Sequence, residues 1–219
     1  MMQYRRFGRT ELSMPVFSCG GMRYQYKWQD APKNQVPLNN QQNLENTIRR
    51  SLECGINHIE TARDYGTSEM QLGEILPLLP REKLIVQTKI SPTPDSHEFQ
   101  CKFEQSLRFL QLEYIDLLAI HGINTLEHFN YSIRPGGCLD IARKLQGQGK
   151  VRFVGFSTHG PTDVIIKTIK TNQFDYVNLH WYYINQNNWS AIEVADEFDM
   201  GVFIICLLYT SPSPRDNSG

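Results

Sequence analysis

Four side chains that carry charge or can exchange protons stand at or just after the ends of strand-like apolar segments. They are Glu60, Tyr65, Lys89 and His121. A buried, apolar sheet has no packing reason to carry such groups at its strand ends, where each unpaired charge would be costly. A carboxylate, a phenol, an ammonium group and an imidazole gathered in one place can carry out acid–base catalysis. The sequence therefore predicts an active site shared by these four residues.

Seven short apolar segments rich in β-branched residues must position them. They are residues 15–22, 56–62, 83–90, 114–121, 151–158, 174–181 and 201–206. Nearly continuous apolar segments are typical of parallel strands that are covered on both faces. Glu60, Lys89 and His121 thus belong to the second, third and fourth predicted strands, and Tyr65 follows the second.

Helical patterns separate the predicted strands. An apolar stripe over residues 44–52 stops at Gly55, a candidate C-terminal cap. Ser68 and Gln71 have the spacing of a capping box at the start of a second helix. Four further helical patterns cover residues 99–110, 138–145, 161–169 and 189–198.

Strands that alternate with helices predict βα units and a parallel sheet. The chain shows no break in composition and no G-x-G-x-x-G or Walker loop, which favours one barrel over two nucleotide-binding domains. We therefore predict one α/β domain over residues 1–206, a TIM-type (β/α)8 barrel that is incomplete, with about seven strands present and the last unit missing. A whole barrel typically needs about 250 residues, and its chemistry lies at the carboxyl ends of the strands.

Residues 207–219, "LLYTSPSPRDNSG", follow no periodicity. We expect an unstructured tail of foreign origin there and exclude it from the fold.

Composition limits the class of partner. The chain has 22 Lys and Arg against 23 Asp and Glu with no basic cluster, which argues against nucleic acid. Its longest apolar segment, 202–209, is far shorter than the roughly 18 residues of a membrane span. The N-terminus lacks the apolar run of a secretory signal. Five scattered cysteines without CxxC spacing are typical of reduced thiols in a cytoplasmic protein.

Five motifs give the chain a resemblance to the aldo-keto reductase family over residues 2 to about 205. They are "MQYRRFGRTELSMPVFSCGGMRY", "NHIETARDYGTSE", "IVQTKI", "IDLLAIHGI" and "GKVRFVGFSTHG". The second is similar to the family's D-T-A-x-x-Y-G-x-S-E signature, and the last resembles its G-K-x-R-x-x-G-x-S-N segment. The resemblance implies that NADPH, with NADH as the alternative, reduces a small aldehyde or ketone to the alcohol, or that the reverse occurs.

The resemblance also implies a role for each of the four side chains. Tyr65 would give a proton to the carbonyl oxygen while nicotinamide C4 supplies a hydride to the carbonyl carbon. Lys89 should favour the phenolate form of Tyr65 and so make its hydroxyl more acidic. Glu60, where the family has Asp, would hold Lys89, although its extra methylene moves the carboxylate by roughly 1.5 Å. His121 would orient the carbonyl and share the proton path.

By the same resemblance, Ser157, Thr158, Asn178, Gly21 and Met22 would bind the cofactor. Ser157 matches the family's residue, whereas Thr158 stands at an Asn position and Asn178 at a Gln position. Thr158 offers a single hydroxyl group for hydrogen bonding, whereas an amide offers a separate donor group and acceptor group. The family's phosphate-binding segments are not found in this chain, so the choice between NADPH and NADH, the substrate and the oligomeric state stay open.

Neighbouring residues are given no catalytic part. Arg63 and Asp64 fill the variable positions of the signature and are interpreted as surface charges. Asp116 and Asp175 stand at the beginnings of their predicted strands, at the opposite end of the barrel, and are interpreted as structural. Candidates for the wall of a carbonyl pocket are Tyr24, Tyr26, Trp28 and Trp181.

Two other functions remain alternatives. Histidines near strand ends resemble those of metal-dependent barrel hydrolases, in which imidazoles bind Zn²⁺ and activate water. These histidines are His58, His121, His159 and His180. Because His58 should start its strand and no paired H-x-H is present, we predict no metal site. The chain could also be an inactive nucleotide-binding fragment, since a barrel that lacks a strand has open edges.

Overall fold

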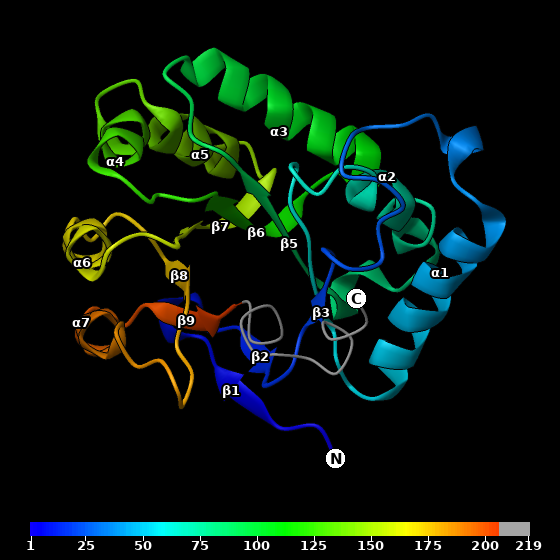
Figure 1. Ribbon diagram of the computed structural model, residues 1–219, viewed down its shortest axis with the longest axis horizontal. Helices are drawn as coiled ribbons and strands as arrows, with labels where there is room; N and C mark the ends of the chain where they lie inside the picture. The colour runs from blue at the N-terminus through cyan, green and yellow to red at the C-terminus, as the bar shows by residue number, and fades with distance from the viewer. Residues whose placement is uncertain (206–219) are drawn as a thin grey trace, which may run out of the picture.

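The computed structural model describes residues 1–205 and places seven parallel strands in one sheet (Figure 1). In sheet order they are β3 (Cys19–Gly20), β4 (His58–Glu60), β5 (Ile85–Ile90), β6 (Ile115–Ile120), β7 (Val151–Ser157), β8 (Tyr176–Leu179) and β9 (Gly201–Ile204). The order of the strands in the sheet is their order in the chain. The sheet curls with helices along its outer side, which confirms the predicted incomplete (β/α)8 barrel. The predicted boundary at residue 206 and the predicted tail, 207–219, lie outside the described residues.

Seven α-helices within the described residues connect and cover the strands. They are α1 (Leu38–Glu53), α2 (Ser68–Leu72), α3 (Ser96–Leu110), α4 (Leu126–Ile133), α5 (Cys138–Gly147), α6 (Thr162–Lys170) and α7 (Trp189–Glu197). Short 3-10 helices cover Gly8–Thr10, Lys33–Gln35, Leu76–Leu78 and Arg81–Lys83. All the predicted helical patterns correspond to α-helices. The additional helix α4 was not predicted, because the apolar stripe of an eight-residue helix is hard to separate from a loop.

The predicted C-terminal cap of α1 is confirmed. Gly55 has a φ of +82°, and its N–H donates to the carbonyl oxygen of Leu52 at 2.9 Å. The N–H of Ile56 donates to the carbonyl oxygen of Ser51 at 2.8 Å. Together these bonds form a Schellman motif, which needs left-handed backbone and therefore favours glycine.

The predicted capping box of α2 is wrong. Thr67 precedes the helix and Ser68 is its first residue, with the Ser68 hydroxyl 2.8 Å from that of Thr61. Gln71 accepts hydrogen bonds from the Tyr26 N–H at 2.9 Å and from the Thr67 hydroxyl at 2.8 Å. The polar side chains of this short helix therefore hold the long loop after β3 instead of capping the helix itself.

A hairpin of β1 (Tyr4–Arg6) and β2 (Ser13–Pro15) covers the amino-terminal end of the barrel. Phe7, in the turn of this hairpin, packs against Tyr176 at the start of β8, with ring centroids 5.6 Å apart. The predicted first strand, 15–22, is therefore divided between the hairpin and the barrel.

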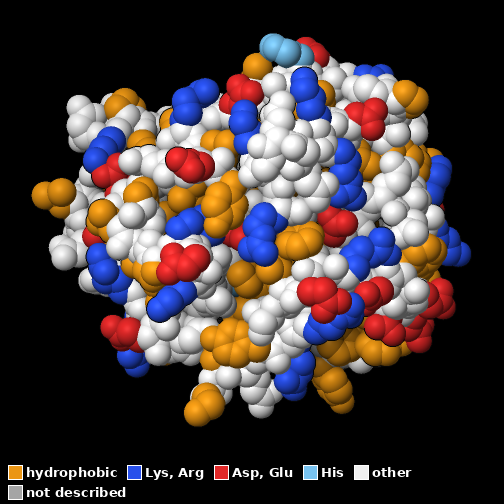
Figure 2. All heavy atoms as spheres, turned by 180° about the vertical axis from the view of Figure 1, so that it is seen from behind, with side chains coloured by type: hydrophobic (Ala, Val, Ile, Leu, Met, Phe, Trp, Pro, Cys, Tyr) orange, Lys and Arg blue, Asp and Glu red, His pale blue; other side chains and the backbone are white. Residues whose placement is uncertain are grey.

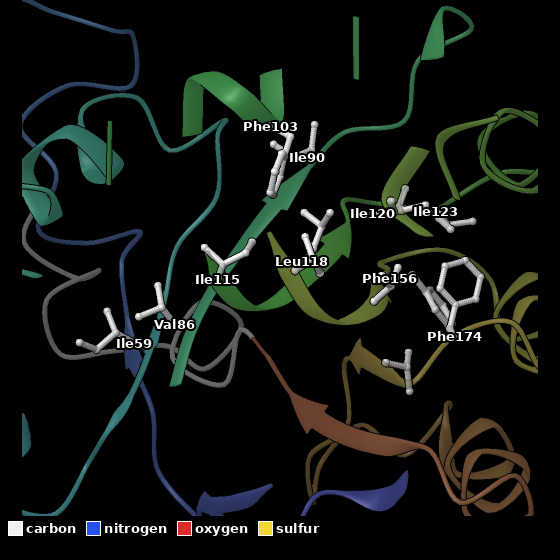
Figure 3. Close-up of a cluster of buried hydrophobic side chains, with 14 of the residues drawn as sticks. Ile59, Val86, Ile90, Phe103, Ile115, Leu118, Ile120, Ile123, Phe156 and Phe174 are labelled. Atoms are coloured by element: carbon white, nitrogen blue, oxygen red, sulfur yellow. The ribbon is translucent and has the colours of Figure 1, made fainter. Parts of the chain in front are cut away.

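The main core lies between the sheet and the helices (Figure 3). Ile59 of β4, Val86 and Ile90 of β5, and Leu118 of β6 belong to one cluster with Phe103 of α3, and all five are 0% exposed. Burying each such side chain contributes about 1.5–3 kcal/mol. On each strand these residues alternate with residues of the barrel interior, so the core also fixes which side chains point inward.

The surface carries both signs of charge. On the face in Figure 2, Lys and Arg side chains are interspersed with Asp and Glu, and apolar side chains lie between them. No helix within residues 1–205 has both the length and the apolar character that crossing a membrane requires.

Candidate active site

Strand alternation places Glu60, Lys89 and His121 at one rim of the barrel. Glu60 is the last residue of β4, Lys89 is the next to last of β5, and His121 directly follows β6. The residue next to each of them in the chain points into the main core. Because successive side chains of a strand point to opposite faces, the three side chains point to the barrel interior. The carboxyl ends of these neighbouring strands bring the three side chains together.

Lys89 is the centre of this cluster. Its ammonium group forms an ion pair with Glu60 and donates to the Tyr65 hydroxyl at 3.1 Å. It also donates to the carbonyl oxygen of Thr61 at 3.0 Å. The side chain of Lys89 is 2% exposed and that of Glu60 is 10% exposed, so water screens the pair only weakly. The longer Glu side chain therefore keeps the expected ion pair.

Tyr65 lies in the turn that follows β4. Its N–H donates to the carbonyl oxygen of Ala62 at 3.0 Å. Gly66, with a φ of +52°, leaves no room for a side chain, because a Cβ there would lie 2.0 Å from the carbonyl oxygen of Lys27. This close approach brings Trp28 edge-on to the Tyr65 ring, with centroids 6.4 Å apart. The phenol is thus held between the ammonium group and the long loop after β3.

The other pocket candidates lie in different environments. Tyr24 is buried, at 7% exposure, and Trp181 packs against Trp189 of α7 with ring centroids 5.7 Å apart. Tyr26 is bound through its backbone to α2. Trp28 is the candidate that contacts the cluster, and at 55% exposure it can meet a substrate.

His121 approaches Tyr65 from the strand next to Lys89. Its N–H donates to the carbonyl oxygen of Ile90 at 2.7 Å, and its ring is edge-on to that of Tyr65 with centroids 5.9 Å apart. Its Nδ1 lies 3.3 Å from Oδ2 of Asp64. Burial lowers the pKa of His121, and the Asp64 carboxylate partly opposes this effect.

The interpretation of Arg63 as a surface charge is wrong. Its side chain is 7% exposed and forms ion pairs with Glu69, which is fully buried, and with Asp30. Burial raises the pKa of Glu69. Because Asp30 belongs to the long loop after β3, Arg63 ties this loop to the turn that carries Tyr65. The residue fills a variable position of the signature, and side-chain direction in a turn cannot be read from periodicity.

Asp64 is exposed, as predicted, but it is not an isolated surface charge. Its side chain is 48% exposed, and Oδ2 accepts a hydrogen bond from the Ser91 hydroxyl at 2.6 Å in addition to its contact with His121. His121 and Ser91 lower the pKa of Asp64 to about 2. Its place directly before Tyr65 in the chain is the one sequence signal for this position.

Three residues predicted to bind the cofactor lie at the ends of β7 and β8. Ser157 pairs in register with Asn178, and its hydroxyl accepts from the Gly122 N–H at 3.1 Å. The Thr158 hydroxyl donates to the carbonyl oxygen of Ile123 at 2.9 Å, so it is engaged with the backbone. Asn178 is 0% exposed, and its amide makes no hydrogen bond in the described part of the chain. Asn178 is therefore the best placed of the three to take a ligand's amide.

The other two predicted cofactor residues follow β3. The N–H of Gly21 donates to the carbonyl oxygen of Glu60 at 2.7 Å, and a Cβ on Gly21 would lie only 2.8 Å from that oxygen. Gly21 therefore lets the chain pass close to the carboxyl end of β4. Met22 comes next and is partly exposed at the same rim.

The four histidines do not form one site. His58 starts β4, as predicted, and its ring nitrogens lie 2.6 Å from the Ser18 hydroxyl and 3.2 Å from Oε1 of Gln87. At the opposite rim, the rings of His159 and His180 lie 4.1 Å apart. Within residues 1–205, no three His, Cys, Asp or Glu side chains converge as metal ligands would.

Asp116 and Asp175 lie at the amino-terminal ends of their strands, as predicted. Asp116 is fully buried and pairs with Arg81 at 2.7 Å and Arg152 at 2.6 Å. Asp175 accepts a hydrogen bond from the Val154 N–H at 2.7 Å. Both carboxylates therefore join neighbouring elements, which supports their structural interpretation.

His58 should make the fold sensitive to acid. Burial lowers its pKa to about 3, whereas an unfolded chain would have a value near 6.5. The folded state therefore excludes a proton that the unfolded state binds, and stability falls as the pH drops from 6.5 towards 3. We expect about 2 kcal/mol of this loss at pH 5 relative to pH 8.

Urea unfolding of wild type and His58→Gln at both pH values measures this effect. The variant should lose about 2 kcal/mol less than wild type between pH 8 and pH 5. Equal losses in the two proteins would show that His58 does not contribute.

A partial (β/α)8 barrel with a carboxylate, an ammonium group and a phenol in contact at its carboxyl rim defines the class of this protein. Residues 18–165 match the Aldo/keto reductase family, and the chain belongs to this family.

Known proteins agree with this assignment. A probable aldo-keto reductase from Glycine max is 28% identical over 185 residues, which are 78% of this chain and 48% of that protein. The chain thus spans about half the length of the curated relatives it matches. The fold matches an aldo-keto reductase from Bacillus halodurans in its holo form, with a TM-score of 0.77, 21% identity and coverage of 93% of this chain and 66% of that one. It also matches an aldo-keto reductase from Klebsiella pneumoniae in complex with NADPH, with a TM-score of 0.74, 18% identity and coverage of 95% and 69%.

Proposed function

We propose that the chain carries the catalytic rim of an NAD(P)H-dependent reductase that converts a small aldehyde or ketone to the alcohol, or catalyses the reverse reaction. The proposed catalytic residues are Tyr65, Lys89, His121 and Glu60. The observation that carries the proposal is the contact of 3.1 Å between the Lys89 ammonium and the Tyr65 hydroxyl, with Glu60 paired to the same ammonium. Membership of the aldo/keto reductase family supports the reaction class.

The charges of the cluster suit Tyr65 to be a proton donor. An ammonium group next to a phenol stabilises the phenolate that remains after proton transfer. Glu60 keeps the ammonium charged and in place, since an isolated buried ammonium would tend to lose its proton. Low exposure of Lys89 strengthens both interactions.

His121 and Trp28 suit the cluster to hold a carbonyl group. His121 presents an imidazole beside Tyr65, so one carbonyl oxygen can accept hydrogen bonds from the phenol and the ring. Trp28 lies edge-on to the phenol and would exclude water from this side.

The residues of the rim fit a nicotinamide cofactor. The buried amide of Asn178 has its donor and acceptor atoms unpaired in the described part of the chain, as a site for a carboxamide requires. Ser157 lies beside it in register, and Gly21 and Met22 would form the opposite wall. A reduced nicotinamide bound there would supply the hydride for the carbonyl carbon. NADPH is our first choice because an aldo-keto reductase of the same fold is solved with it.

Nucleotide binding and turnover measured together test this proposal. Purified full-length protein should bind NADPH with quenching of tryptophan fluorescence, and it should consume NADPH only when a small aldehyde is added. Binding without turnover of any carbonyl compound would favour a nucleotide-binding module. Stoichiometric zinc without nucleotide binding would favour the hydrolase alternative.

A further inference from the structure

Two carboxylates approach the rim around Tyr65, and the proposed function uses only one of them. Glu60 acts through Lys89, which contacts the phenol. Asp64 contacts His121, whose ring is edge-on to the same phenol. The Asp64–His121 pair thus has the same arrangement as the Glu60–Lys89 pair. In each, a carboxylate contacts a cationic or proton-carrying group, and that group contacts Tyr65.

Asp64 is held in place by its own partners. Its Oδ2 accepts from the Ser91 hydroxyl at 2.6 Å, and Ser91 follows β5 directly after Lys89 and Ile90. The turn of Asp64 is tied to the same strand end, because the Arg63 N–H donates to the carbonyl oxygen of Lys89 at 2.9 Å. The carboxylate therefore has a fixed position relative to the strand that carries Lys89.

The 3.3 Å approach of the Asp64 carboxylate to Nδ1 bears on which nitrogen of His121 carries a proton. A neutral imidazole has one N–H, and a carboxylate 3.3 Å from Nδ1 favours the form with its proton on that atom. Nε2 then remains as the nitrogen that can face a reacting oxygen. When the ring takes a second proton, Nε2 becomes a donor, and the carboxylate stabilises the resulting cation.

We propose that Asp64 is a positioning residue for carbonyl reduction that acts through His121. Its carboxylate fixes the imidazole by Nδ1 and favours the doubly protonated ring, so that Nε2 donates a hydrogen bond to the carbonyl oxygen while Tyr65 gives its proton. This role rests on the proposed function of the rim, but the state of the His121 ring can be measured without any substrate.

The other charges near His121 oppose protonation. Burial, and to a smaller extent Lys89, lower the pKa of His121, and Asp64 raises it. His159 also lies close enough to interact, and its own pKa is lowered to about 4, mainly by burial, so it is neutral near pH 7. The Tyr65 ring is in edge-on contact with that of His121. Removing the charge of Asp64 should therefore lower the pKa of His121.

The first test follows the His121 ring by nitrogen-15 NMR over a pH titration. Wild type, Asp64→Asn and Asp64→Glu are compared, with His121→Gln used to assign the signals. We expect Asp64→Asn to lower the pKa of His121 and to shift the neutral ring away from the Nδ1–H form, and Asp64→Glu to restore both. An unchanged pKa and tautomer in Asp64→Asn would overturn the proposal. Asp64 is half exposed, so neither variant should disturb folding.

The second test measures kcat/KM for aldehyde reduction against pH in the full-length protein. Asp64→Asn should lower kcat/KM about tenfold at neutral pH, move the basic limb to lower pH and leave NADPH affinity unchanged. Asp64→Glu should recover most of the activity, which a merely structural contact would not require. Superimposable pH profiles of wild type and Asp64→Asn would contradict the positioning role while leaving the proposed function intact. Absence of turnover in wild type, together with the expected NMR shift, would instead contradict the proposed function and support the contact.

Discussion

Replacing Tyr65 by phenylalanine should lower kcat/KM for aldehyde reduction by about 10²- to 10⁴-fold, the usual contribution of a positioned general acid. The substitution removes only the hydroxyl that accepts from Lys89 at 3.1 Å. The ring remains available to pack against Trp28 and His121. NADPH affinity, measured by fluorescence titration, should therefore change little.

Trp28→Phe is the matched control for this variant. It alters the other ring of the edge-on pair and leaves the proposed proton donor in place. We expect it to change KM for the aldehyde more than kcat. Turnover of Tyr65→Phe within a few fold of wild type would contradict the assignment of Tyr65 as the proton donor.

Replacing Lys89 by methionine should damage both activity and stability. The substitution leaves the nearly buried carboxylate of Glu60 without its partner, which typically costs about 3–5 kcal/mol. It also removes the charge that stabilises the phenolate, so we expect a loss of at least about 10²-fold in kcat. Urea unfolding and steady-state kinetics measure the two effects separately.

The double variant Lys89→Met/Glu60→Gln separates these causes. Neutralising Glu60 removes the unpaired charge, so most of the stability should return while activity stays low. A single variant as stable as wild type would show that the ion pair is not maintained in solution. Recovery of turnover in the double variant would contradict the need for an ammonium group.

Strand periodicity made three of the four proposed catalytic residues predictable. Glu60, Lys89 and His121 lie at or just after strand ends. Successive side chains of a strand point to opposite faces, and this two-residue period determines that the three point inward. Parallel strands end at the same rim of a barrel, so residues at the ends of consecutive strands lie close together in space. Tyr65 lies in a turn, and its position rested on the signature motif rather than on periodicity.

Residues in turns and loops were harder to interpret. The direction of Arg63 depends on the backbone of the turn and on Asp30, 33 residues earlier in the chain, neither of which a local pattern reveals. Ser68 and Gln71 had capping-box spacing, but the Gln71 side chain instead accepts a hydrogen bond from the long loop after β3. The engagement of Thr158 with the backbone likewise depends on packing between neighbouring strands, and so does the amide of Asn178, which is unpaired within residues 1–205.

Isotope tracing tests most directly whether this rim transfers a hydride to carbonyl groups. Full-length protein is incubated with a small aldehyde and NADPH deuterated at C4, on each face in turn, and the alcohol is analysed by mass spectrometry. We expect one deuterium on the carbinol carbon from one labelled face, and almost no product from Tyr65→Phe. Alcohol formed without deuterium from either face, or formed equally well by Tyr65→Phe, would contradict hydride transfer at a site where Tyr65 gives the proton.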